Sequence, residues 1–107
     1  MAELSKLQIR AKILSVISEI KTTKHYNAQI YEKLKEELSQ IEDRSALFDI
    51  FIKEYIKLEE NEFTFACILL KDLIDKEYLE EKVYKCLESK SYTDESKYKL
   101  IQLLRLS

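Results

Sequence analysis

Apolar residues recur every three or four positions along most of the chain, which is the spacing of one face of an α-helix. The first such stripe lies in a helix predicted from near Ala2 or Ser5 to about Lys21. Its members are Ile9, Ile13, Val16, Ile17 and Ile20. Five further segments show comparable spacing, so we predict an all-α protein of about six helices.

Polar residues with short side chains separate these segments. Ser, Thr, Asn and Asp favour helix starts because their side chains accept hydrogen bonds from the free backbone amides of the first turn. The residues assigned as N-caps of the second to the sixth helix are Asn27, Asp43, Asn61, Asp75 and Thr93. The second helix is expected to run to about Ser39, and the third is expected to end near Glu60.

Apolar residues flank two of these caps. Tyr26 precedes Asn27 and Tyr31 follows it by four positions, which is the placement of a hydrophobic staple. Ile74 and Leu79 have a comparable placement around the start of the fifth helix. We therefore expect structural roles for both pairs.

Three of the caps are almost evenly spaced. Asn27, Asn61 and Thr93 begin the second, fourth and sixth helices at separations of 34 and 32 residues, which indicates an internal repeat of two-helix units. The predicted hairpins of this single domain, residues 1–107, span approximately residues 2–39, 43–74 and 76–106. The alternative is a compact helical bundle, in which similar amphipathic helices resemble a repeat by chance. A stack joins neighbours in sequence only, whereas a bundle brings the first helix against the last.

The trailing helices of these hairpins contain the lines FACILLKDL and YKLIQLLRL. With these lines and a period of 32 to 34 residues, the chain resembles HEAT-type or related α-helical repeats over most of its length. The resemblance implies three stacked antiparallel hairpins in a right-handed α-α superhelix. It also implies that the trailing helices bind proteins, or occasionally nucleic acid.

The fourth and sixth helices carry unusually wide apolar surfaces. The fourth is apolar around nearly its whole circumference from Phe63 to Ile74, as a buried helix is. The apolar residues of the last helix are Leu100, Ile101, Leu103, Leu104 and Leu106. A terminal repeat normally turns a polar face outward. Either the chain is therefore one part of a longer array, or a second copy or a partner covers this surface.

Composition excludes several kinds of chemistry. The 107 residues include no Gly and no Pro, so phosphate-cradling loops, nucleophile elbows and calcium-binding loops cannot be formed from known motifs. The side chains of His25, Cys67 and Cys86 stand alone and far apart, unlike structural zinc ligands. Cys67 is interpreted as core, and Cys86 as the more accessible thiol. We predict no enzyme, no catalytic residue, no cofactor and no metal, and no small-molecule substrate is indicated.

The net charge of −2 is unevenly distributed. Residues 1–27 carry +3, residues 28–66 carry −5 and residues 67–107 carry 0. The basic first helix is far weaker than the dense stripe of a nucleic-acid-binding protein, so nucleic acid is the least favoured partner. The early apolar stretch is interrupted by Lys12 and Glu19, which argues against a signal peptide or a membrane span. Two cysteines in such a chain indicate free thiols and a cytoplasmic location.

Interaction is the class of function that these observations favour. Phe63 stands where the other proposed repeats have polar residues, and Tyr92 precedes a cap without an apolar staple partner. The candidate partner-binding residues are Phe63, Tyr92, Leu103 and Leu106. We predict a non-catalytic protein-interaction or scaffold domain that binds a protein partner or itself. The alternative is a small helical-bundle regulator or immunity-type protein that acts by dimerisation or partner binding.

Overall fold

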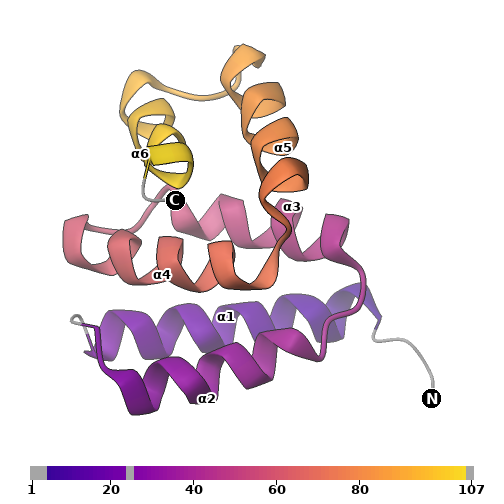
Figure 1. The fold of residues 1–107 in the computed structure, drawn as a ribbon, viewed down its shortest axis with the longest axis vertical. Coiled ribbons are helices and arrows are strands. Elements are labelled where there is room, and N and C mark those ends of the chain that lie inside the picture. The colour runs from indigo at the N-terminus through magenta and orange to yellow at the C-terminus, as the bar shows by residue number, and fades with distance from the viewer. Residues whose placement is uncertain (1–4, 24–25, 106–107) are drawn as a thin grey trace.

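The computed structural model describes residues 5–23 and 26–105, and within these ranges the chain forms α-helices and no strand. The helices are α1 (Lys6–Thr23), α2 (Ala28–Ser39), α3 (Arg44–Tyr55), α4 (Glu60–Leu73), α5 (Lys76–Glu88) and α6 (Asp94–Arg105) (Figure 1). The prediction of an all-α protein with six helices is therefore confirmed.

Side-chain caps fix the starts of most helices. Asn27 accepts hydrogen bonds from two amides in the first turn of α2, at 3.0 and 3.1 Å. Asp43 accepts one from the amide of Ala46 at 3.0 Å, and the Thr93 hydroxyl oxygen accepts one from the amide of Ser96 at 3.1 Å. Each bond satisfies a donor that the helix itself leaves unpaired, and these three predicted caps are confirmed.

The start of α4 differs from the prediction. Asn61 lies inside the helix, because α4 begins at Glu60 with Glu59 as its N-cap. The amide of Glu59 donates to the carboxylate of Glu62 at 3.0 Å, so a residue of the first turn reaches back to the cap. The assignment of Asn61 as a cap is therefore wrong. Asp75 stands at the predicted start of α5, but its side chain makes no capping hydrogen bond.

The third helix also ends earlier than predicted, at Tyr55 rather than near Glu60. The amides of Lys57 and Leu58 donate to carbonyls three residues earlier, each at 3.1 Å, which tightens the chain into a turn of 3₁₀ type. Leu58 is buried in this turn. Burial of one apolar residue therefore continues the apolar stripe beyond the end of the helix.

The Tyr26 staple is confirmed. The ring of Tyr26 lies 5.5 Å from that of Tyr31 and 5.6 Å from that of Phe65, measured between centroids. These tilted aromatic contacts connect the entrance of α2 to α4. Ile74 and Leu79 are both buried.

Consecutive helices contact each other in three pairs, but the most extensive contact joins α1 and α3. Within the pairs, α1 contacts α2, α3 contacts α4 and α5 contacts α6. Between the pairs, α1 contacts α3 and α4, α2 contacts α4, and α4 contacts α6. In Figure 1, α1 and α2 form one layer, α3 and α4 form the next, and α5 stands across the direction of α4. These contacts are consistent with stacked hairpins and with a compact bundle, so the relation to HEAT-type repeats stays a prediction.

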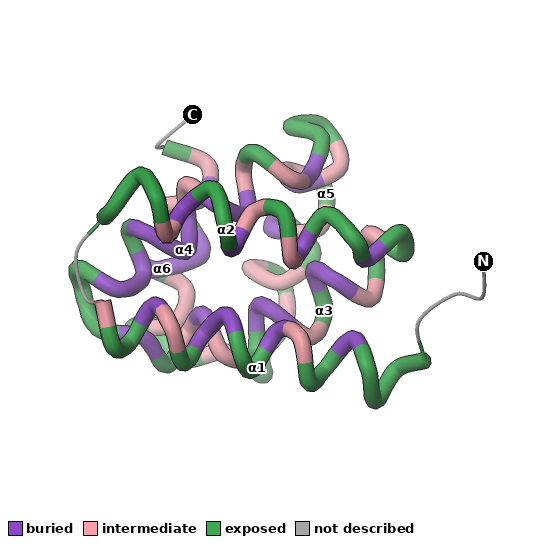
Figure 2. Tube along the Cα trace, turned by 90° about the horizontal axis from the view of Figure 1, so that it is seen from below, coloured by how far each residue is buried: buried purple, intermediate pink, exposed green. Residues whose placement is uncertain are grey.

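Helix α4 lies at the centre of the core, as its apolar circumference predicts. It contacts α1, α2, α3 and α6. Its buried residues are Glu62, Phe63, Phe65, Ala66, Cys67, Leu69 and Leu70. In contrast, α1 buries one stripe, which Figure 2 shows as purple positions that alternate with exposed green ones. The outer faces of α1 and α2 are therefore the solvated side of the molecule.

Candidate functional site

Of the sequence-predicted contact residues, the structure describes Phe63, Tyr92 and Leu103, and it does not bring these three together. Phe63 and Leu103 are only 6% and 1% exposed, and each borders a different surface depression. Tyr92 is half-buried beside the core, where its hydroxyl oxygen accepts from the Cys86 thiol at 3.8 Å. Burial and, to a lesser extent, this thiol raise the pKa of Tyr92 to about 12. Leu106 lies outside the described residues.

The first depression, which we call the Phe63 groove, lies between the turn after α3, the first turn of α4 and the first half of α6. Its volume is about 500 Å³. The residues that line it are Lys57, Leu58, Glu59, Glu60, Phe63, Glu95, Tyr98 and Lys99. Phe63 and Leu58 are buried apolar residues of this lining, whereas the side chain of Tyr98 is 56% exposed. The groove therefore combines apolar surface with an accessible aromatic ring.

A reciprocal pair of hydrogen bonds fixes the walls of the Phe63 groove. The hydroxyl of Tyr55 donates to the carbonyl of Lys99 at 2.7 Å, and the ammonium of Lys99 donates to the carbonyl of Ile56 at 2.8 Å. A lysine is well suited to the last carbonyls of a helix, which carry partial negative charge. The ring of Tyr55 also meets Phe63 edge-on, with centroids 6.1 Å apart. These contacts join α6 to the end of α3.

The Tyr55 hydroxyl is deeply buried, and burial is the main cause that raises its pKa above the usual value. Burial disfavours the phenolate because the charged form loses its hydration. The group therefore stays protonated and available as the donor to Lys99. Tyr55 is best explained as a structural residue of the groove.

The charged side chains that line the Phe63 groove and make no ion pair in the described ranges are mostly acidic. Lys57 pairs with Glu54 at 3.6 Å, and the ammonium of Lys99 is used by the end of α3. Three carboxylates of the lining are on exposed residues and make no ion pair with another residue in the described ranges: Glu59, Glu60 and Glu95. The lining therefore carries a net formal charge of −1, and an occupant of this groove would meet these three carboxylates beside the edges of Phe63 and Leu58.

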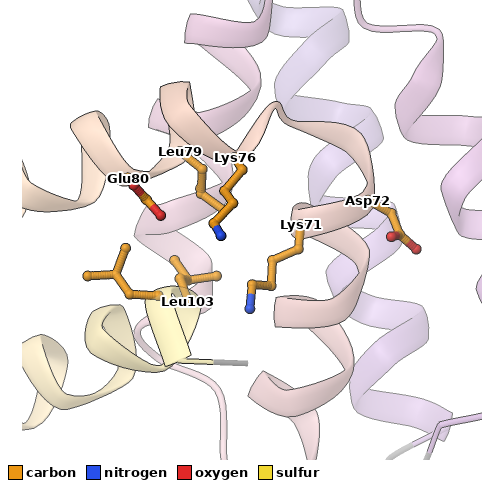
Figure 3. A pocket seen from close by; sticks show the side chains of 7 residues that line it. Lys71, Asp72, Lys76, Leu79, Glu80 and Leu103 are labelled. Carbon is orange, nitrogen blue, oxygen red and sulfur yellow. The ribbon is translucent and has the colours of Figure 1, made fainter. Parts of the chain in front are cut away.

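The second depression, which we call the lysine pocket, lies between the end of α4, the start of α5 and the end of α6 (Figure 3). Its volume is about 300 Å³. The residues that line it are Lys71, Asp72, Lys76, Leu79, Glu80, Leu103 and Leu104. It shares no lining residue with the Phe63 groove, although α4 and α6 contribute to both.

Lys71 is the unusual residue of the lysine pocket. Its ammonium nitrogen is buried and has no hydrogen-bond partner among the described residues. Burial lowers the pKa of Lys71 below the usual value, an effect that the Cys67 thiol opposes and the nearby Lys76 reinforces. Loss of hydration disfavours the charged amine.

Cys67 belongs to the core, as the sequence predicted. It is fully buried, and its thiol donates to the carbonyl of Gln102 at 3.7 Å. Burial raises the pKa of Cys67, although the positive charge of Lys71 opposes this effect. A buried thiol of this kind is a poor nucleophile, because the thiolate is the reactive form.

The described residues contain neither a membrane-spanning helix nor a cluster of metal ligands. Within residues 5–23 and 26–105, no helix combines the length and the apolar character needed to cross a bilayer. In the same ranges, no group of three or more His, Cys, Asp or Glu side chains is placed to hold a metal ion. His25 lies outside the described residues.

The sequence contained a signal for the lysine pocket that we did not use. Lys71 follows the run FACILL in a helix that is apolar around nearly its whole circumference. A lysine in such a helix must place part of its side chain on a buried face. The role of Lys99 had no comparable signal, because Tyr55 and Lys99 are separated by 44 residues.

Comparisons with known proteins give no family. No family model matches the chain, and no curated protein or solved structure is significantly similar to it. The two depressions and the residues that line them are therefore the features of this chain from which a function can be inferred.

Proposed function

We propose that this chain is a non-catalytic protein-interaction domain whose Phe63 groove binds a basic, partly apolar segment of a partner protein. The observation that carries this proposal is the pairing of the accessible Tyr98 ring with three carboxylates that make no ion pair with another residue in the described ranges. A partner segment would cover the ring with an apolar side chain and would place Lys or Arg residues near the carboxylates. Opposite potentials across an interface favour the correct partner and speed its association.

Tyr98 is the residue of the groove best placed to contribute binding energy. It is accessible, and tyrosine is enriched at interfaces because one side chain offers both apolar area and a hydroxyl. Phe63 is a less suitable target for mutation because it is packed against Tyr55. Its replacement by a charged residue would disturb the fold and the groove together.

The test is selection of random displayed peptides against the full chain, with Tyr98→Glu as the variant and Tyr84→Glu as the matched control. Tyr84 and Tyr98 are both 56% exposed, but only Tyr98 lines the groove. We expect selected peptides to be rich in Lys and Arg with at least one large apolar residue. Their affinity should fall when salt is raised, should be lost in Tyr98→Glu and should be retained in Tyr84→Glu.

Equal binding by native protein and Tyr98→Glu would overturn the groove as the binding site. Selection of acidic peptides would overturn the proposed partner chemistry. Sedimentation equilibrium of the native chain tests the alternative of a small dimeric regulator. A stable dimer that Tyr98→Glu leaves intact would favour that alternative over partner binding through the groove.

Nucleic-acid binding by the basic first helix has less support. The ammonium of Lys12 pairs with Glu37 at 3.0 Å, so one positive charge of that helix is already compensated. We expect the domain to act in the cytoplasm, because Cys67 and Cys86 are both free and reducing compartments keep thiols in this state.

A further inference from the structure

The lysine pocket contains a buried positive charge that no described residue neutralises. The ammonium of Lys71 is buried without a hydrogen-bond partner in the described part of the chain. A polar group in that position loses its hydration without compensation, which is costly for an ammonium. An anion that entered the pocket would restore the missing hydrogen bonds.

The other charges around the pocket also favour an anion. Figure 3 shows the amine of Lys76 directed into the same space as that of Lys71, whereas the carboxylate of Asp72 points away on the far side of α4. Glu80 contributes the carboxylate that faces the space. Two ammonium groups and one carboxylate leave one positive charge. Lys76 is also the first residue of α5, at the end of the helix that carries partial positive charge.

The walls of the pocket select for an apolar group beside that anion. Leu79 and Leu103 are buried, and Leu104 completes the lining from the last turns of α6. The volume of about 300 Å³ lies at the lower end of the range of about 300–1,000 Å³ that is usual for ligand pockets. The occupant should therefore be small, singly charged and partly aliphatic.

We propose that the lysine pocket binds a monocarboxylate with a short aliphatic tail, with its carboxylate between Lys71 and Lys76 and its tail against the leucines. The groups that face the space carry one net positive charge, and Asp72 on the far side of α4 brings the whole lining to zero, so a singly charged carboxylate suits the pocket better than a doubly charged phosphate. Burial and the nearby Lys76 lower the pKa of Lys71, and a carboxylate bound between the two amines would oppose both effects. This inference is independent of the Phe63 groove, which has a separate lining.

The test is a titration of the ¹⁵N-labelled full chain with octanoate, followed by amide chemical shifts at constant ionic strength. Octanol and octylamine serve as ligands without the carboxylate. The variant is Lys71→Met, which keeps an unbranched apolar side chain, and the matched control is Lys53→Met, which replaces an exposed lysine on α3. We expect shifts at the end of α4, the start of α5 and the end of α6. Loss of a charged hydrogen bond should weaken octanoate at least about tenfold in Lys71→Met.

Several outcomes would overturn the proposal. If octanol binds as tightly as octanoate, the carboxylate contributes nothing to affinity and the pocket is only an apolar cavity. Unchanged octanoate affinity in Lys71→Met, or shifts that avoid the three helix ends, would place the ligand elsewhere. If Lys71→Met fails to fold, Lys76→Met provides the same test from the accessible side of the pocket.

A second titration distinguishes a free aliphatic acid from the carboxyl terminus of a protein as the natural ligand. The dipeptide acetyl-Leu-Leu carries a free carboxylate beside an apolar side chain, as an apolar carboxyl terminus of a protein does. Tighter binding of octanoate would support a free aliphatic acid as the ligand. Tighter binding of the dipeptide would overturn the free acid and assign the pocket to a chain terminus.

Discussion

Helices α4 and α5 have similar lengths but very different surroundings. Seven of the 14 residues of α4 are buried, whereas two of the 13 residues of α5 are buried. The first four helices therefore share a dense core, and the hairpin of α5 and α6 depends on a few apolar anchors and on polar bonds. Both depressions lie where this hairpin meets the rest of the molecule. The thinly packed hairpin therefore forms one wall of each depression, and the dense core holds the opposite wall in place.

The largest loss of folding stability is expected when a buried side chain of either region is truncated to alanine. Phe51 and Val83 are both fully buried, in α3 and α5 respectively. Phe51→Ala should lower the free energy of unfolding by about 3–5 kcal/mol, because a large core side chain is removed. Val83→Ala should lower it by roughly 1.5 kcal/mol, which corresponds to two fewer buried carbon groups. Urea denaturation measures both values, and a loss at Phe51 no larger than that at Val83 would contradict the placement of Phe51 in a well-packed core.

A smaller effect is expected at the bonds that attach α6. Tyr55→Phe removes the hydroxyl that donates to the Lys99 carbonyl, and loss of this one hydrogen bond should cost about 0.5–1.5 kcal/mol. Native-state hydrogen exchange should show faster exchange in α5 and α6 than in α1 and α2. Tyr84→Phe is the control, because the Tyr84 side chain is exposed. Uniformly faster exchange through all six helices would show that the last hairpin does not open separately.

The caps should give effects of about 1 kcal/mol or less. Asn27→Ala removes two hydrogen bonds at the start of α2 and should lower the free energy of unfolding by about 1 kcal/mol. Asn61→Ala is the matched control, because Asn61 lies inside α4 and is exposed. Thermal unfolding should show a clear loss for the first variant and little change for the second. A loss of similar size at Asn61 would contradict the start of α4 at Glu60.

The smallest effect should be on how the free energy of unfolding depends on pH when Lys71 is replaced. The pKa of Lys71 is lowered in the folded chain, so the unfolded chain binds more protons between that lowered value and the ordinary one. The free energy of unfolding therefore gains a contribution that rises with pH across this window. Lys71→Met should remove that contribution and should leave the protein at least as stable near neutral pH. A steeper rise in the variant would contradict the assigned direction.

Much of the fold was predictable because its causes are local. Caps such as Asn27 and Asp43 act within one helical turn, and the staple of Tyr26 acts across one cap. The end of α3 was predicted wrongly because Leu58 continues the apolar stripe although the backbone has already turned. An apolar pattern reports burial of a side chain, and a residue in a turn is buried as readily as one in a helix.

The sites were less predictable because their members come from distant parts of the chain. Phe63 was identified as a candidate, but its partners in the groove come from α6 as well as from the preceding turn. The convergence of Lys71 and Lys76 depends on the tight corner between α4 and α5. A periodic pattern gives the face of each helix and leaves open which faces meet.

The hydrogen bonds that join Lys99 to Tyr55 and Ile56 also bear on the order of folding. They connect positions 44 and 43 residues apart, and closing such a loop costs chain entropy that the contacts within each hairpin avoid. Tyr55 lies at the end of α3 and Lys99 lies in α6, which is synthesised after α1 to α4. We therefore expect α1 to α4 to assemble first and α6 to dock in the final step.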